Sequence, residues 1–123
     1  MNDGTYNVYS RLRRVSPDLV RDINPLLLDG EEILYAYKGL HDYCAFTNNR
    51  IVAVYVPGTT GKKKSYCNIP YTKIDAFSIE TLNAMDVDSE LTLHCQNIGI
   101  VRFGFVGKNE ALEIAQMVSA IIL

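Results

Sequence analysis

Residues 46–78 read FTNNRIVAVYVPGTTGKKKSYCNIPYTKIDAFS and contain apolar runs that are separated by turn and loop signals. Asn48 and Asn49 tolerate the positive φ angles that a tight two-residue turn requires, and apolar residues stand on both sides of them. Residues 43–46 and 51–56 are therefore predicted to form a β-hairpin, from which the rest of the chain can be interpreted.

The second strand of this hairpin ends at Pro57, because proline lacks the N–H group that a strand must donate to its neighbour. A loop with two glycines follows, and residues 65–69 then read as another short strand. Pro70 interrupts that strand before alternation resumes at residues 75–79. We expect the chain to bend at Pro70 and to pass there from one sheet to a second.

The N-terminal part contains one predicted helix and one predicted strand. Residues 1–15 are expected to be a flexible lead-in, since chain ends are poorly ordered unless they are tied down, and residues 16–123 a single domain. A serine N-cap followed by proline at Ser16–Pro17 predicts a short helix, which Pro25 should interrupt or kink. Residues 31–38 read as the first strand.

The C-terminal half contains two alternating segments, residues 90–95 and 100–105, followed by a helix over about residues 109–123. The helix residues at core-facing spacing are Leu112, Ala115, Val118 and Ile122. Seven short strands followed by one amphipathic helix predict a mainly β (α+β) fold. We expect a bent antiparallel sandwich or partial barrel, one open end of which the C-terminal helix covers.

Composition limits the classes of protein to which this chain can belong. With 123 residues, 48% of them hydrophobic and 21% charged, the chain is predicted to fold as one domain. A net charge of −2 gives no general attraction to nucleic acid, so none is expected as a partner. No apolar run approaches the ~20 residues of a membrane span, and three unevenly spaced cysteines favour reduced thiols, so we expect a soluble cytoplasmic protein.

The strand at residues 51–56 is apolar on both faces, because Val52, Val54 and Val56 alternate with Ile51, Ala53 and Tyr55. An antiparallel strand with one solvated face should alternate between apolar and polar residues, so a second layer must cover the other face. Either the N-terminal helix or another subunit can provide that cover. We favour the second alternative, which predicts a homo-oligomer with Val52, Val54, Tyr55 and Val56 at the interface.

Five motifs occur in order along the chain, at residues 46–50 (FTNNR), 61–63 (GKK), 69–71 (IPY), 77–81 (FSIET) and 86–91 (DVDSEL). In this order they resemble the motifs of the bacterial pleckstrin-homology (PH) domain family, over about residue 17 to the end. The resemblance implies a seven-stranded PH-like barrel with a C-terminal capping helix. It also implies membership of a family mostly of unknown function, some members of which form rings, so a ring-shaped homo-oligomer is expected.

The candidate site for an anionic ligand is the lysine run Lys62, Lys63 and Lys64, which could attract an acidic membrane surface. Three charges are fewer than the four to eight that usually mark lipid recognition. The loop after the first strand, residues 38–42, carries one lysine and one opposing aspartate, so phosphoinositide selectivity is not expected. At most weak peripheral contact with a membrane is predicted.

No motif in the sequence predicts a metal site, a cofactor or catalysis. The cysteines and histidines lack the close pairing of zinc ligands, and the acids at residues 86–90 lack the glycine and the final glutamate of an EF-hand loop. No nucleophile elbow or phosphate-binding glycine loop is present. The sequence therefore favours a non-enzymatic binding or scaffolding module that self-associates, with a peripheral membrane adaptor as the alternative.

Overall fold

The computed structural model describes residues 5–58, 63–81 and 88–123, without the side chains of residues 5–7. The strands are β1 (Thr5–Val15), β2 (Ile33–Lys38), β3 (Tyr43–Thr47), β4 (Arg50–Tyr55), β5 (Ser65–Pro70), β6 (Ile74–Thr81), β7 (Asp88–Cys95) and β8 (Gly99–Val106). Two 3₁₀ helices, η1 (Pro17–Leu26) and η2 (Tyr71–Lys73), and the α-helix α1 (Glu110–Ile122) complete the described elements.

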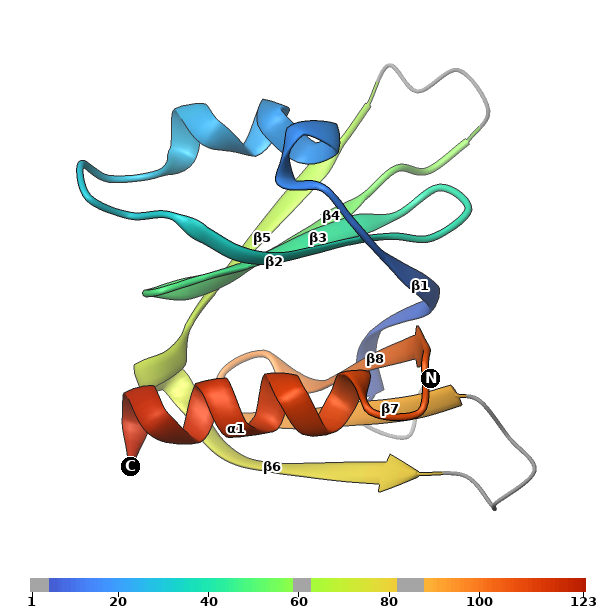
Figure 1. Cartoon of the computed structure of the whole chain (residues 1–123), viewed down its shortest axis with the longest axis vertical. Coiled ribbons are helices and arrows are strands. Elements are labelled where there is room, and N and C mark those ends of the chain that lie inside the picture. The colour runs from blue at the N-terminus through green and yellow to red at the C-terminus, as the bar shows by residue number, and fades with distance from the viewer. Residues whose placement is uncertain (1–4, 59–62, 82–87) are drawn as a thin grey trace.

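The strands form one open sheet in the order β5-β4-β3-β2-β1-β8-β7-β6, which bends into two layers (Figure 1). Strands β2–β5 make one layer and β6–β8 the other, and β1 lies between them in the strand order. The predicted bend at Pro70 is confirmed, because η2 carries the chain from β5 at one edge to β6 at the other. The mainly β, sandwich-like fold with a C-terminal helix is likewise confirmed.

The sheet has eight strands, one more than predicted, because residues 5–15 form β1. The prediction of a flexible lead-in over residues 1–15 is therefore wrong for this segment, and residues 1–4 lie outside the described residues. Strand β1 runs parallel to β8 and antiparallel to β2. Its register shifts between Tyr9 and Leu12, and Arg11 there has a φ of 56°. The side chains of Tyr9 and Leu12, on either side of this irregularity, consequently both enter the core, although residues three positions apart in a regular strand point to opposite faces.

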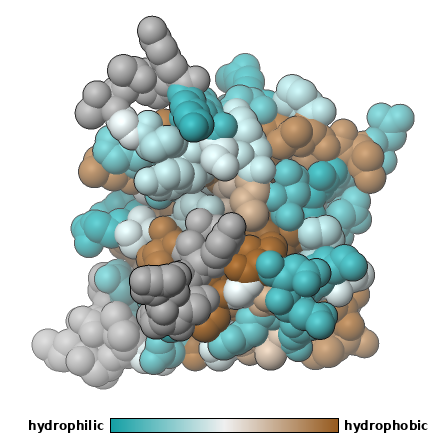
Figure 2. Space-filling model, turned by 180° about the vertical axis from the view of Figure 1, so that it is seen from behind, coloured by the Kyte–Doolittle hydropathy of each residue, from teal (hydrophilic) through white to brown (hydrophobic). Residues whose placement is uncertain are grey.

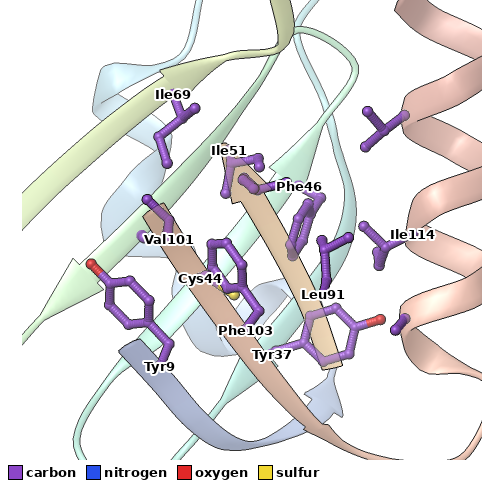
Figure 3. Packing of buried hydrophobic residues seen from close by; sticks show 14 of the residues in the cluster. Tyr9, Tyr37, Cys44, Phe46, Ile51, Ile69, Leu91, Val101, Phe103 and Ile114 are labelled. Atoms are coloured by element: carbon purple, nitrogen blue, oxygen red, sulfur yellow. The ribbon is translucent and has the colours of Figure 1, made fainter. Parts of the chain in front are cut away.

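The core between the two layers is built around aromatic side chains (Figure 3). Tyr37 and Phe46 come from the upper layer of Figure 1, and Phe103 and Phe105 come from β8. The ring centroids of Tyr37 and Phe105 are 4.7 Å apart, and those of Phe46 and Phe103 are 5.6 Å apart. Aromatic pairs at such distances add to the stabilisation that comes from buried area alone.

Helix α1 covers the open end of this core, as predicted. Ala111, Ile114 and Val118 are buried against the core. The helix is rotated from the expected orientation, because Leu112 is 42% exposed while its neighbour Ala111 is buried. The hydroxyl of Tyr37 donates a 2.6 Å hydrogen bond to Glu110, which joins the start of the helix to β2.

The outer face of the upper layer carries a second apolar cluster, and η1 covers it. Val20 and Ile23 of η1 are buried against Ala45, Val52 and Val54. The side chain of Ser16 accepts a hydrogen bond from the Asp18 N–H, as expected of an N-cap, although the helix is of the 3₁₀ type. The second face of β4 is thus covered from within the chain, which is the alternative that the sequence analysis did not favour.

An ion pair at the C-terminal end of η1 holds this cover in place. The Arg50 guanidinium donates to both carboxylate oxygens of Glu31, at 2.6 and 2.9 Å, and to the carbonyl oxygen of Leu26 at 3.0 Å. The Glu31 carboxylate also accepts from the Thr47 hydroxyl at 2.6 Å and from the Leu28 N–H at 3.0 Å. These contacts link the hairpin turn to the segment between η1 and β2.

Candidate binding surfaces

The end of the lysine run approaches a polar network on η1 and β3. Lys63 and Lys64 are exposed just before β5, and Lys62 lies outside the described residues. The ammonium of Lys64 lies 3.5 Å from the Asp22 carboxylate and 3.1 Å from the Tyr43 hydroxyl. It also lies 5.5 Å from the centroid of the Tyr43 ring. One lysine of the run is therefore held by contacts within the protein.

The Tyr43 ring has a second cation beside it, because the Lys38 ammonium lies 5.7 Å from the ring centroid. Asp22 partly balances the charge of these cations. Burial opposes ionisation of its carboxyl group, but hydrogen bonds from the hydroxyls of Tyr43 and Tyr66 and the nearby Lys64 charge lower its pKa below the ordinary value. We call Lys38, Tyr43 and Lys64 the Tyr43 cluster.

The four residues predicted at a subunit interface divide into two pairs. Val52 and Val54 are fully buried beneath η1, so the reason for placing these two side chains at an interface is removed. Tyr55 is 50% exposed, and Val56 is partly exposed. Both line a surface hollow of about 430 Å³ next to Leu40, which is 87% exposed. We call Leu40, Tyr55, Val56 and Pro57 the Tyr55 surface.

The described residues do not assemble a metal site, since no group of three or more His, Cys, Asp or Glu side chains among them could hold an ion. Cys44 and Cys95 are buried and Cys67 is partly buried. Burial raises the pKa of all three thiols, which disfavours the reactive thiolate. In the part of the chain that is described, no helix is both long and apolar enough to cross a membrane.

A groove between β6 and the end of α1 is the surface that sequence reasoning missed. Its volume is about 600 Å³, and its apolar lining residues include Ile74, Phe77, Ile121 and Ile122. Figure 2 shows hydrophobic surface at the lower right, the corner at which α1 ends when the molecule is seen from behind. The elements that form the groove are about 45 positions apart in the sequence, so no local motif could indicate it.

A bent, open sheet whose end is covered by a C-terminal helix defines the class of pleckstrin-homology-like proteins. The model of the family described as "Bacterial PH domain" matches residues 5–122. The chain belongs to this family, as the sequence motifs predicted.

Similar proteins extend this result to whole structures. The DUF1696 family protein with a pleckstrin-homology domain from Shewanella loihica PV-4 superposes with a TM-score of 0.73 at 27% identity, covering 93% of this chain and 99% of that one. For the pleckstrin homology domain from Shewanella amazonensis SB2B the TM-score is 0.62 at 32% identity, and 86% of each chain is covered.

A curated relative is similar over part of the chain. The uncharacterized protein YjqA of Bacillus subtilis strain 168 is 43% identical over 68 residues, which are 55% of this chain. The matched segment spans 54% of the relative's own length. The match therefore adds a relative without adding an assigned activity.

Proposed function

We propose that this chain is a non-enzymatic binding and scaffolding module that self-associates through the Tyr55 surface. The observation that carries the proposal is the exposure of apolar side chains at one end of the upper layer, where Leu40 is 87% and Tyr55 50% exposed. Tyrosine and leucine exposed side by side, over a hollow that a partner side chain can fill, are typical of protein interfaces. A closed ring, which the family resemblance implies, would bury this surface without open-ended growth.

The non-enzymatic part of the proposal rests on how three side chains with strongly shifted pKa values, Glu31, Tyr37 and Tyr71, are used. Glu31 is bound to Arg50, the hydroxyl of Tyr37 to Glu110, and the hydroxyl of Tyr71 to the Thr47 carbonyl oxygen at 2.7 Å. Groups that are engaged in this way hold the fold together and are not free to transfer protons. A cytoplasmic location agrees with the three free cysteines, because oxidising compartments favour disulfides.

Sedimentation velocity of the purified protein over micromolar concentrations tests self-association. We expect a species larger than the 13.8 kDa chain, and Tyr55→Asp should give a smaller species with an unchanged circular dichroism spectrum. Leu112→Asp is the matched control, because Leu112 is 42% exposed on α1 and lies outside the Tyr55 surface. A monomeric unmodified protein at every concentration would refute the proposal.

A peripheral membrane adaptor is the second candidate function, and the Tyr43 cluster favours it. Lys38 and Lys64 lie on one aromatic ring, and the exposed Lys63 is adjacent. Such a site would give weak, salt-sensitive attraction to acidic vesicles without selectivity for one head group, at about 1 kcal/mol per lysine. Co-sedimentation with phosphatidylserine vesicles tests it, and binding that survives high salt and the replacement of Lys62, Lys63 and Lys64 by alanine would contradict this mechanism.

A further inference from the structure

The sheet ends at β6, and one side of this strand is not paired with any other described strand. Natural edge strands are usually protected by proline, lysine or a covering segment. The opposite edge strand, β5, ends in Pro70, whereas residues 74–81 of β6 contain neither proline nor lysine. A lysine directly precedes each of the two strands, Lys64 before β5 and Lys73 before β6. Strand β6 therefore presents free backbone N–H and C=O groups as a template for a further strand.

The groove between β6 and α1 lies directly beside this edge. Ile74 and Phe77 of β6 form one wall, and Ile121 of α1, which is 41% exposed, contributes to the other. The groove has a volume of about 600 Å³. A strand that paired with β6 would place alternate side chains over this apolar groove, since successive side chains of a strand point to opposite faces.

Among the described residues that line the groove, the charged side chain is that of Asp75, and the exposed Lys73 stands in the chain between two lining residues. Asp75 is exposed, lines the groove at an irregularity in the β6–β7 register, and forms no ion pair within the described ranges. The last turn of α1 carries no basic residue, so the partial negative charge at the C-terminal end of the helix is not compensated there. An occupant with a positive charge at this end of β6 would complement both features.

We propose that the β6 edge and the adjoining groove bind an extended peptide segment of a partner protein. The segment is apolar at alternate positions and carries a lysine or arginine that lies beside Asp75. Main-chain hydrogen bonds to β6 would supply affinity, and the side chains in the groove would supply selectivity, which is the mode known as β-strand addition. Five extended residues span about 17 Å, so such a segment fits along the eight residues of β6. The inference does not depend on self-association, because the Tyr55 surface involves neither β6 nor α1.

Fluorescence anisotropy with a designed probe tests this inference. The probe is a fluorescein-labelled peptide that alternates threonine and valine and has arginine at both ends, so that either strand direction places a cation near Asp75. The control peptide has glutamate at both ends. We expect saturable binding of the arginine probe, with an affinity about two- to fivefold above that of the control, and we expect Asp75→Lys to reverse this order.

Variants of the groove locate the site. Ile121→Gln should weaken binding about tenfold through lost apolar contact, whereas Leu112→Gln, at a matched exposure on the same helix, should leave it unchanged. If Ile121→Gln fails to fold, Ala76→Gln replaces it as the groove variant. Ala76 is an exposed β6 residue that lines the groove, so the larger glutamine side chain should narrow the groove and weaken binding of the probe. Slower amide hydrogen exchange in β6 on addition of the probe would support strand addition.

Three results would overturn the inference. The first is equal binding of both peptides with no response to Asp75→Lys. The second is binding that neither groove variant weakens, or protection that appears in β5 instead of β6. The third is protection of β6 that rises with protein concentration in the absence of peptide, because a second copy of the chain would then be the occupant of the edge.

Discussion

The buried ion pair between Glu31 and Arg50 leads to a quantitative prediction about stability. The Glu31 side chain has no exposed surface, and that of Arg50 is 19% exposed. The hydrogen bonds from Arg50, and then that from Thr47, outweigh the effect of burial and lower the pKa of Glu31 from 4.5 to about 2. Carried through the linkage between pKa and folding, this difference corresponds to roughly 3 kcal/mol of stability.

Because the folded-state pKa of Glu31 is below its ordinary value, this contribution is complete above about pH 4.5 and is lost as the pH falls towards 2. Arg50→Ala leaves a buried carboxylate without its cation, so the free energy of unfolding at pH 7 should fall by about 3–5 kcal/mol. The loss of stability between pH 4.5 and pH 2 should also become smaller in this variant.

Urea denaturation followed by circular dichroism at pH 7 and at pH 3 measures both effects. The double variant Glu31→Gln/Arg50→Met should be more stable than Arg50→Ala, because it removes the unpaired charge. Arg14→Ala is the control, since Arg14 is 42% exposed in its ion pairs with Glu110 and Glu113 and should cost at most about 1 kcal/mol. The reasoning would be refuted if Arg50→Ala were as stable as the control variant. It would also be refuted if Arg50→Ala lost as much stability between pH 4.5 and pH 2 as the unmodified protein does.

Three further changes test the packing and the surfaces. Val54→Asp should abolish cooperative unfolding, because it places a charge in the cluster under η1, while Tyr55→Asp should remain folded in the same thermal scan. Truncation after Asn109 should give an insoluble chain, since it removes α1 and leaves Leu91, Val101 and Phe103 without cover, each worth ~1.5–3 kcal/mol; a soluble truncation that unfolds cooperatively would count against the capping role of the helix. Tyr37→Phe should lower the free energy of unfolding by about 1–2 kcal/mol, because it removes the hydroxyl that donates a 2.6 Å hydrogen bond to Glu110. An unchanged midpoint of urea denaturation would argue against that contact.

Local signals in the sequence were sufficient for most of the elements. The β3–β4 hairpin, the bend at Pro70 and the C-terminal helix each depend on residues that are close together in the chain, and all three are confirmed. The expected turn type is wrong, because neither Asn48 nor Asn49 has a positive φ. The Thr47 hydroxyl instead accepts hydrogen bonds from the N–H groups of Asn49 and Arg50, both at 2.9 Å. The alternation of residues 90–95 and 100–105 predicts that Leu91 and Phe103 point into the core, and both are fully buried. These predictions succeed because turn chemistry and side-chain alternation act over a few residues.

Strand β1 could not be recognised in the same way. The conformation of Arg11 breaks the two-residue period, so Tyr9 and Leu12 do not follow the alternation that marks a strand. Its parallel partner, β8, is about 95 positions away, and such a pairing leaves no local pattern. The cover of Val52 and Val54 was reduced to two alternatives by sequence alone, and only the position of η1 decides between them.

The position of β1 in the sheet has a consequence for synthesis on the ribosome. Strands β2–β5 pair with one another in sequential order and can assemble as soon as they leave the exit tunnel. Strand β1, in contrast, has one flank against β2 and must wait for its other neighbour, β8, which is made after all the other described strands. Until residues 99–106 arrive, the nascent chain exposes an edge in the middle of its future sheet. Closing that gap joins the two layers late, because it brings together segments that are about 95 positions apart in the sequence.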